Sequence, residues 1–303
     1  MQDTKTIVLG FLDTVHNSLS LKTYITYKQA MKIFIETFGE DVPLSSETYV
    51  RFLQCLRHYS PSSQATYQSA LLGLYTYYAQ NGGDVSLLAI KSAARRFLKK
   101  KGQHLPQFDR DAIERTINYA QMLTTDISGL RDRAFILTLA DTGLRISEAC
   151  SIRRGDLDWK KNRASVIGKG NKQEVIRFSV RAMDAIQDYL NARSQLDDYT
   201  GRSLTSLPLF ARHDKKSGKR VLNVASNGMW YAIKERIKEA GVSPEQIRIH
   251  DFRHYFVTMI YLATGDLKAA QKLARHSDSK TTSLYAHASG KIDKIYDDVF
   301  NRK

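Results

Sequence analysis

The chain has 303 residues and carries 46 Lys and Arg against 31 Asp and Glu, a formal net charge of +15. That length suggests two domains, and the charge favours a polyanionic partner, with nucleic acid the first candidate and an anionic membrane surface the second. No apolar run approaches the ~20 residues that span a bilayer, and the start lacks the basic opening and cleavage site of a signal peptide. The membrane alternative is therefore the weaker one.

The first hundred residues show helical periodicity and no convincing strand. Residues 20–39 begin at a potential cap, Ser20, and end at a glycine, and residues 60–83 begin with a serine cap followed by proline at the first helical position. Residues 45–59 fill a third helix between them. We expect a compact bundle of about four helices, a DNA-binding domain over residues 1–98.

A basic segment follows this bundle. The sequence KSAARRFLKKKGQHLPQFDRD is dense in positive charge and ends with glycine and proline before a helix that starts near Asp111. We interpret residues 99–108 as a linker between domains. Such a run is usually only a solvated surface, but here it could also cross a nucleic-acid backbone and join the two domains into a clamp.

The remainder, residues 109–303, is predicted to be mostly helical with one small sheet. Turns at Lys160–Asn162 and at KGNK separate the alternating stretches RASVIGK and EVIRFSV, which predicts three antiparallel strands. Helical patterns precede and follow this sheet. The fold class is therefore mainly α, with a small antiparallel three-stranded sheet. Cys55 and Cys150 lie apart in helical patterns, so we expect two buried thiols in a reducing compartment and no disulfide or zinc site.

Four separate places combine cationic or hydrogen-bonding side chains with helix starts or turns. Arg145 enters a helix, where backbone donors favour an anion, and Lys169 lies at the tip of the predicted hairpin. His250 and Arg253 are three residues apart on one helix face. Each has a structural alternative, such as an ion pair of Arg145 with Glu148 or an exposed turn lysine.

The fourth place is ARHSDSKTTSLYAH, with His276 nine residues before Tyr285. Tyr285 is one of 16 tyrosines, and its apolar neighbours are typical of a packed core residue. Taken together, however, the four places supply two arginines, a lysine, two histidines and a tyrosine. That set suits transesterification at a phosphodiester: the guanidinium groups neutralise the phosphate, the tyrosine attacks and a lysine or histidine protonates the departing oxygen. This chemistry needs no metal and no other cofactor.

These motifs, in this order and spacing, resemble those of the tyrosine recombinase (phage integrase) family over residues 108–290. The resemblance implies that Arg145 and Arg253 bind the scissile phosphate and that Lys169 protonates the leaving 5′ oxygen. It implies that His250 assists proton transfer and that His276 hydrogen-bonds a non-bridging oxygen. Tyr285 would form a 3′-phosphotyrosine link. The resemblance therefore implies six catalytic residues: Arg145, Lys169, His250, Arg253, His276 and Tyr285. Glu148 and Asp156 are expected to support them.

Two positions depart from the family pattern. The family commonly has Leu-Gly before the last histidine, where this chain has Ala274 and Arg275, and Phe252 replaces a more usual leucine. A charged residue at that helix end could change its geometry or add a phosphate contact. Both departures leave the catalytic residue types intact, so they affect rate or regulation rather than chemistry.

The resemblance implies a site-specific recombinase that exchanges strands of double-stranded DNA through a Holliday junction, as a homo-tetramer in the cytoplasm or nucleoid. An apolar helical stripe within residues 290–303 could dock on its own domain or, as the family suggests, on a neighbouring protomer. Two alternatives stay open. One is nicking and resealing like a type IB topoisomerase, and the other is a non-catalytic DNA-binding protein of the same fold.

Overall fold

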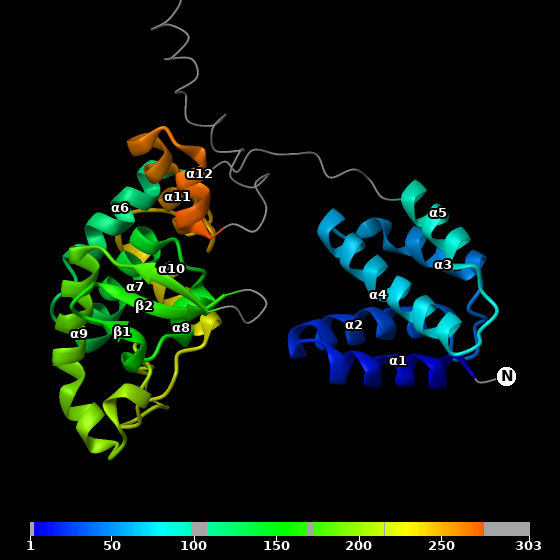
Figure 1. The fold of residues 1–303 in the computed structure, drawn as a ribbon, viewed down its shortest axis with the longest axis horizontal. Helices are drawn as coiled ribbons and strands as arrows, with labels where there is room; N and C mark the ends of the chain where they lie inside the picture. Colours follow the sequence, from blue (N-terminus) through cyan, green and yellow to red (C-terminus); the bar gives the residue numbers. More distant parts are fainter. Residues whose placement is uncertain (1–2, 98–107, 169–172, 215, 276–303) are drawn as a thin grey trace, which may run out of the picture. The chain divides into compact units, whose positions relative to one another are not determined.

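The computed structural model describes residues 3–97, 108–168, 173–214 and 216–275, and the chain divides into two compact units, Met1–Gln103 and His104–Lys303 (Figure 1). Lys169, His276, Tyr285 and most of the predicted linker lie outside the described residues. In the described part, no helix is long and apolar enough to cross a membrane.

The first unit is a helical bundle. Its described elements are α1 (Thr4–Ser18), α2 (Leu21–Phe38), α3 (Ser46–Cys55), the 3-10 turn η1 (Leu56–His58), α4 (Pro61–Gln80) and α5 (Leu87–Phe97). The predicted caps are present: the Ser20 hydroxyl accepts from the Thr23 backbone N–H, and the Ser60 hydroxyl accepts from that of Ser63. A core rich in aromatic side chains joins the helices, including Tyr49, Phe52 and Tyr75.

Three details of this unit differ from the sequence prediction. The described bundle contains five α-helices rather than about four, since α1 and α5 lack the strong turn signals that mark α2 and α4. The third predicted helix ends at Cys55 and continues only as a 3-10 turn. Cys55 is exposed, so its expected burial was wrong, whereas Cys150 is buried.

The second unit surrounds a small sheet with helices. Its described elements are α6 (Arg110–Gln121), α7 (Ile127–Thr142), α8 (Ile146–Ser151), η2 (Arg154–Asp156), β1 (Leu157–Asp158), β2 (Arg163–Ile167), β3 (Gln173–Arg177), α9 (Val180–Tyr199), η3 (Leu204–Ser206), α10 (Ser226–Glu239), α11 (Asp251–Thr264) and α12 (Leu267–Ala274). This confirms the mainly helical fold class with its three-stranded sheet.

The sheet is antiparallel in the order β1-β2-β3. Ala164 pairs with Ile176, and Ile167 pairs with Gln173 at the end of the hairpin. The alternate residues Ala164, Val166 and Ile176 are buried, so one face of the sheet packs on the core. The hairpin therefore has a fixed face and a fixed register, and its tip carries the segment that contains Lys169.

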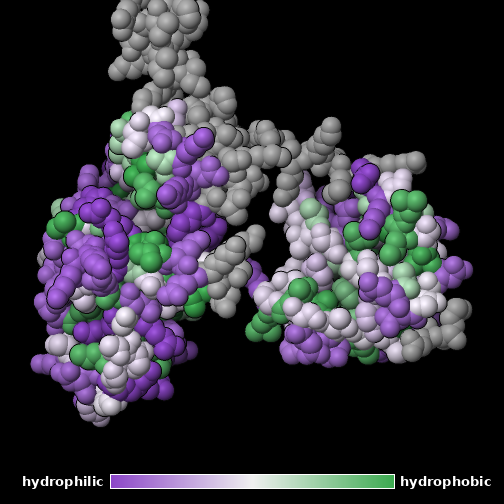
Figure 2. Space-filling model, viewed as in Figure 1, coloured by the Kyte–Doolittle hydropathy of each residue, from purple (hydrophilic) through white to green (hydrophobic). Residues whose placement is uncertain are grey.

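Helix α7 lies at the centre of the second unit. Its side chains are buried on nearly every side, and consecutive residues from Ala134 to Leu137 belong to the main core. A helix buried on all faces shows little amphipathic periodicity. Its C-terminal end is held by packing, and this end leads directly to Arg145. On the face seen in Figure 2, hydrophilic side chains cover most of this unit and apolar ones form scattered spots.

Candidate active site

Arg145 stands between α7 and α8, where it is the N-cap residue of α8. Glu148 holds it twice: Oε2 accepts from the Arg145 backbone N–H at 3.0 Å, and Oε1 accepts from Nη1 at 2.6 Å. The ion pair that the sequence offered as an alternative to a functional role is thus present. The Arg145 side chain remains 37% exposed, so the pair orients the guanidinium and leaves part of it accessible.

Gly143 makes the turn before Arg145 possible. It ends α7 in the left-handed conformation, with φ 62°. A Cβ at this position would lie 2.5 Å from Cδ1 of Phe256 on α11. Glycine is required here both because of its backbone angle and because the ring of Phe256 occupies the space.

Arg253 lies in the first turn of α11 and is only 6% exposed. Its Nη1 donates to the Gly143 carbonyl oxygen at 2.6 Å, and its Nη2 donates to the carbonyl oxygen of Ala274. Two segments far apart in sequence are thereby tied to one guanidinium: the turn before Arg145 and the end of α12, which precedes His276. The structure brings Arg253 close to the Arg145 turn, as the predicted site requires.

His250 is the N-cap residue of α11, and its side chain is exposed. Partial desolvation, followed by the positive charges of Arg145 and Arg253, lowers the pKa of His250 below its usual value, and the charge of Asp251 opposes this only in part. The imidazole is therefore neutral at pH 7. Arg253 follows His250 by three residues, and it binds the carbonyl of Gly143, two residues before Arg145, so the start of α11 lies beside the Arg145 turn.

The residues between His250 and Arg253 fix the start of α11. Asp251 is buried, and its Oδ2 accepts from the Arg248 backbone N–H at 2.7 Å. Phe252 is 1% exposed and belongs to the main core. The departure from leucine at this position is therefore a packing difference, on the side of the helix away from the exposed His250.

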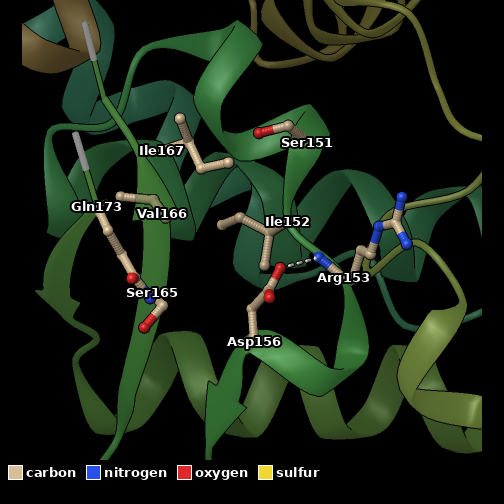
Figure 3. Close-up of a pocket in the computed structure, with 8 residues that line it drawn as sticks. All are labelled: Ser151, Ile152, Arg153, Asp156, Ser165, Val166, Ile167 and Gln173. Carbon is tan, nitrogen blue, oxygen red and sulfur yellow. Dashed lines mark hydrogen bonds between the residues drawn. The ribbon is translucent and has the colours of Figure 1, made fainter. Parts of the chain in front are cut away.

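Lys169, His276 and Tyr285 fall outside the described residues, so their predicted roles rest on the sequence. The strands that lead to Lys169 are described, however. Figure 3 shows a groove beside them, where the turn after α8 faces the end of the hairpin. Its lining comprises Ser151, Ile152, Arg153, Asp156, Ser165, Val166, Ile167 and Gln173.

Asp156, which we expected to support the site, stabilises this turn. Its Oδ2 accepts from the Arg153 backbone N–H at 2.7 Å, the contact drawn in Figure 3. The carboxylate caps η2 and so fixes the connection from α8 to β1. Within the described residues its role is structural.

The sequence did not reveal the partners of Arg275. Its Nη2 lies 3.1 Å from Oε2 of Glu148, and its Nη1 lies 3.3 Å from Oε2 of Glu174 on β3. Burial acts to raise the pKa of Glu148, but hydrogen bonds from the Arg145 backbone and side chain and the charge of Arg275 outweigh it, so the pKa is lowered. Glu148 is therefore an ionised carboxylate between two guanidinium groups. The only sequence signal for this was an arginine where the motif has glycine.

The described site combines two anchored guanidinium groups with a neutral imidazole. Guanidinium groups bind non-bridging phosphate oxygens through directed, charge-assisted hydrogen bonds, and a neutral imidazole can accept or relay a proton. Across the described ranges, no group of three or more His, Cys, Asp or Glu side chains could hold a metal ion.

Comparison with known proteins identifies the family of the chain. The family model for the phage integrase family matches residues 107–291. Tyrosine recombinase XerC from Xylella fastidiosa (strain M23) is 27% identical, over 93% of this chain and 92% of its own length. Tyrosine recombinase XerD from Lacticaseibacillus casei is 28% identical, with the same coverage of 93% and 92%.

Solved structures share the fold. The post-cleavage complex of XerH site-specific recombinase bound to a palindromic difH substrate superposes with a TM-score of 0.71 at 19% identity, covering 96% of this chain and 83% of that one. A lambda integrase dimer bound to a core site gives a TM-score of 0.66 at 16% identity, covering 94% and 95%. The chain belongs to the phage integrase family of tyrosine recombinases, enzymes of site-specific recombination that cut and rejoin DNA strands by transesterification.

Proposed function

We propose that this recombinase cleaves double-stranded DNA with Tyr285 as nucleophile and with Arg145 and Arg253 as ligands of the scissile phosphate. The observation that carries the proposal is the contact between Arg253, on the helix that His250 caps, and the turn that carries Arg145. Attack forms a bond between the Tyr285 oxygen and phosphorus and breaks the bond to the 5′ oxygen. The phosphodiester energy is retained in the 3′-phosphotyrosine, so rejoining needs no cofactor.

The arginines would act as charge on the phosphate grows. The five-coordinate phosphorus carries more negative charge than the ground state, and anchored donors stabilise it without reorganising. Arg253 is held by two backbone carbonyls and Arg145 by Glu148, so both are oriented in advance. Their side chains are thus suited to bind the non-bridging oxygens of a phosphate in a fixed place.

Protons would move through the histidines, Lys169 and Tyr285. A tyrosine hydroxyl has an ordinary pKa of about 10, so it needs cationic neighbours and a proton acceptor to become nucleophilic. The neutral His250 is suited to assist that transfer. Lys169, carried at the hairpin tip, would protonate the 5′ oxygen as it leaves, and His276 would hydrogen-bond a non-bridging oxygen.

The DNA-bound assembly is proposed to be a homo-tetramer that exchanges one strand pair and then the other through a Holliday junction. The helical domain predicted over residues 1–98 and the basic linker, residues 99–108, would contact the DNA backbone. Leu19, Leu21 and Ile25, near the α1–α2 turn, remain exposed. Apolar side chains gain little beside phosphates, so we place them against a neighbouring protomer. The protein would act on DNA in the cytoplasm, associated with the nucleoid.

The apolar stripe of residues 290–303 would dock on the neighbouring protomer and couple the active sites. Deleting residues 290–303 should then reduce assembly on two DNA sites, measured by sedimentation, while leaving the melting temperature of the DNA-free protein nearly unchanged. Unchanged assembly after the deletion would argue against exchange. Leu21→Ser gives an independent test of the α1–α2 contact in the same experiment.

Tyr285→Phe tests the chemistry. A library of nicked duplexes traps covalent adducts, because the short fragment between the cleavage site and the nick carries the free 5′ hydroxyl and diffuses away. Sequencing the trapped DNA then identifies the target site. We expect an adduct with the wild type and none with Tyr285→Phe. An adduct that persists in Tyr285→Phe would exclude this nucleophile. No adduct with either protein would favour the non-catalytic DNA-binding alternative.

Recombination and topoisomerase-like resealing are separated by a second assay. Two copies of the trapped site on distinguishable duplexes should yield four-way junctions and exchanged products. Relaxation of supercoiled DNA without any junction would favour the topoisomerase-like alternative.

A further inference from the structure

Arg275 adopts a backbone conformation that is unusual for its residue type. It follows α12 as the C-cap residue with φ 55° and ψ 44°, in the left-handed region. Among the described residues, only Asn162 shares a positive φ without being glycine. Asparagine tolerates this region because its short polar side chain can hydrogen-bond locally, whereas arginine is disfavoured there. The Arg275 N–H donates to the carbonyl oxygens of Gln271 and Lys272, and contacts of its side chain add to these bonds in holding the conformation.

Those contacts are two carboxylates from different elements. The guanidinium reaches Glu148 on α8 and Glu174 on β3, at 3.1 Å and 3.3 Å. Its side chain is only 9% exposed, so solvent screens these ion pairs less than pairs on an open surface. Both terminal nitrogens face protein carboxylates, and this orientation distinguishes Arg275 from a side chain that reaches outward to DNA.

The two carboxylates belong to the segments that carry other site residues. Glu148 orients Arg145 through its other oxygen. Glu174 lies at the base of the hairpin tip that contains Lys169, and a Cβ on Gly168 would come within 3.0 Å of its Oε2. Arg275 itself directly precedes His276. One side chain thus joins the Arg145 helix, the lysine hairpin and the entry to the segment with His276 and Tyr285.

We propose that Arg275 is a positioning residue for DNA cleavage, whose guanidinium holds Glu148 and Glu174 together so that the segment with His276 and Tyr285 is aligned with Arg145 and Lys169. The proposal rests on the proposed function for its effect on cleavage. Arg275 acts through its carboxylate partners and makes no phosphate contact.

Three substitutions separate the parts of this arrangement. Arg275→Gly removes both ion pairs, and glycine suits the left-handed backbone at this position. Arg275→Lys keeps the positive charge, but the compact ammonium group can pair well with only one of the two carboxylates. Glu174→Gln breaks only the link to the hairpin. Arg212→Gln, which breaks an exposed ion pair with Asp214, is the matched control for loss of one positive charge.

Single-turnover cleavage of the nicked duplex trapped by the wild type is the first measurement. Misalignment of reacting groups by about 1 Å can cost roughly 100-fold in rate, so we expect Arg275→Gly to cleave about 10- to 100-fold more slowly. Arg275→Lys and Glu174→Gln should fall between it and the wild type. The double variant Arg275→Gly/Glu174→Gln should be no slower than Arg275→Gly alone. Wild-type rates in Arg275→Gly, or additive losses in the double variant, would overturn the proposal.

The salt dependence of DNA affinity distinguishes positioning from direct phosphate binding. Each phosphate contact contributes about 0.9 to the slope of log affinity against log salt concentration. We expect Arg275→Gly to leave this slope unchanged. A slope reduced by about one contact, relative to Arg212→Gln, would make Arg275 a phosphate ligand and contradict the proposal.

Hydrogen exchange of the DNA-free full-length chain is independent of the proposed function. Arg275→Gly and Glu174→Gln should both speed amide exchange in β2 and β3, whereas Arg212→Gln should not. Unchanged exchange in both variants would overturn the positioning role. Should the wild type form no DNA adduct, the proposed function fails while this exchange experiment still decides whether Arg275 couples the segments. Glu174→Gln, at a side chain 36% exposed, remains usable even if Arg275→Gly is unstable.

Discussion

Gly143→Ala should destabilise the second unit by an amount that can be worked out from its surroundings. Forcing alanine into the left-handed region at φ 62° costs about 1–2 kcal/mol. The new Cβ would also lie 2.5 Å from the Phe256 ring, and relieving such an overlap costs about 1–3 kcal/mol. The total expected loss of unfolding free energy is about 2–5 kcal/mol. Both tryptophans, Trp159 and Trp230, lie in this unit, so their fluorescence during urea titration reports on it alone.

Gly201→Ala is the matched control. Gly201 also has φ 62°, but no atom lies within 4 Å of a Cβ built on it, so only the backbone cost of about 1–2 kcal/mol should appear. The difference between the two variants measures the overlap with Phe256. When Gly143→Ala is introduced into the Phe256→Ala variant, its additional loss of unfolding free energy should equal that caused by Gly201→Ala. Equal losses in Gly143→Ala and Gly201→Ala would show that the packing of α11 against the Arg145 turn is not as described.

Two further predictions concern ionisation in the site. Glu148→Gln should lower the free energy of unfolding by about 3 kcal/mol, near the lower end of the range for breaking a buried pair, because Arg145 is partly exposed. Urea titration measures this loss, and the variant should also lose DNA cleavage. The lowered pKa of Glu148 means that its contribution to stability is present above its ordinary value of 4.5 and is lost as pH falls through the lower folded value, so Glu148→Gln should flatten the acid limb of the stability profile. For His250, NMR titration should give a midpoint below 6.5, and Arg145→Gln should raise it by removing one repelling charge. The unfolded chain then takes up this proton first, so His250 weakens folding as pH drops below about 6.5; a midpoint unaffected by Arg145→Gln would mean that the two side chains are not neighbours.

Local sequence signals predicted much of the fold, because helix ends and hairpins are determined by nearby residues. The serine caps at Ser20 and Ser60 and the turn at Lys160–Asn162 act over a few residues, and the structure confirms them together with the antiparallel pairing of β2 and β3. The same reasoning missed α1 and α5 as separate helices and placed Cys55 inside the core, since burial depends on partners that are distant in sequence.

The candidate site was likewise predictable only where nearby residues determine it. The motifs indicated Arg145, His250 and Arg253, and the structure places the helix that carries Arg253 and begins at His250 beside the Arg145 turn. The Glu148 partner of Arg145 was predicted, because it lies three residues along the same short segment. The partners of Arg253 and Arg275 were not predictable, because they are backbone carbonyls or carboxylates far along the chain. Arg275 meets Glu174 across 101 residues and Glu148 across 127. No short-range pattern encodes such pairs.

The two carbonyls that receive Arg253 lie where helices end. Gly143 terminates α7 and Ala274 is the last residue of α12, so the guanidinium lies at the negative ends of two helix dipoles, each equivalent to about half an elementary charge. Arg253 therefore holds two helix ends together in addition to its proposed contact with the phosphate. Replacing it would loosen α7 and α12 together, so loss of recombination in an Arg253 variant mixes structural damage with lost chemistry. Tyr285→Phe, which removes one hydroxyl oxygen, is the substitution suited to preparing a complex of inactive enzyme with uncleaved DNA.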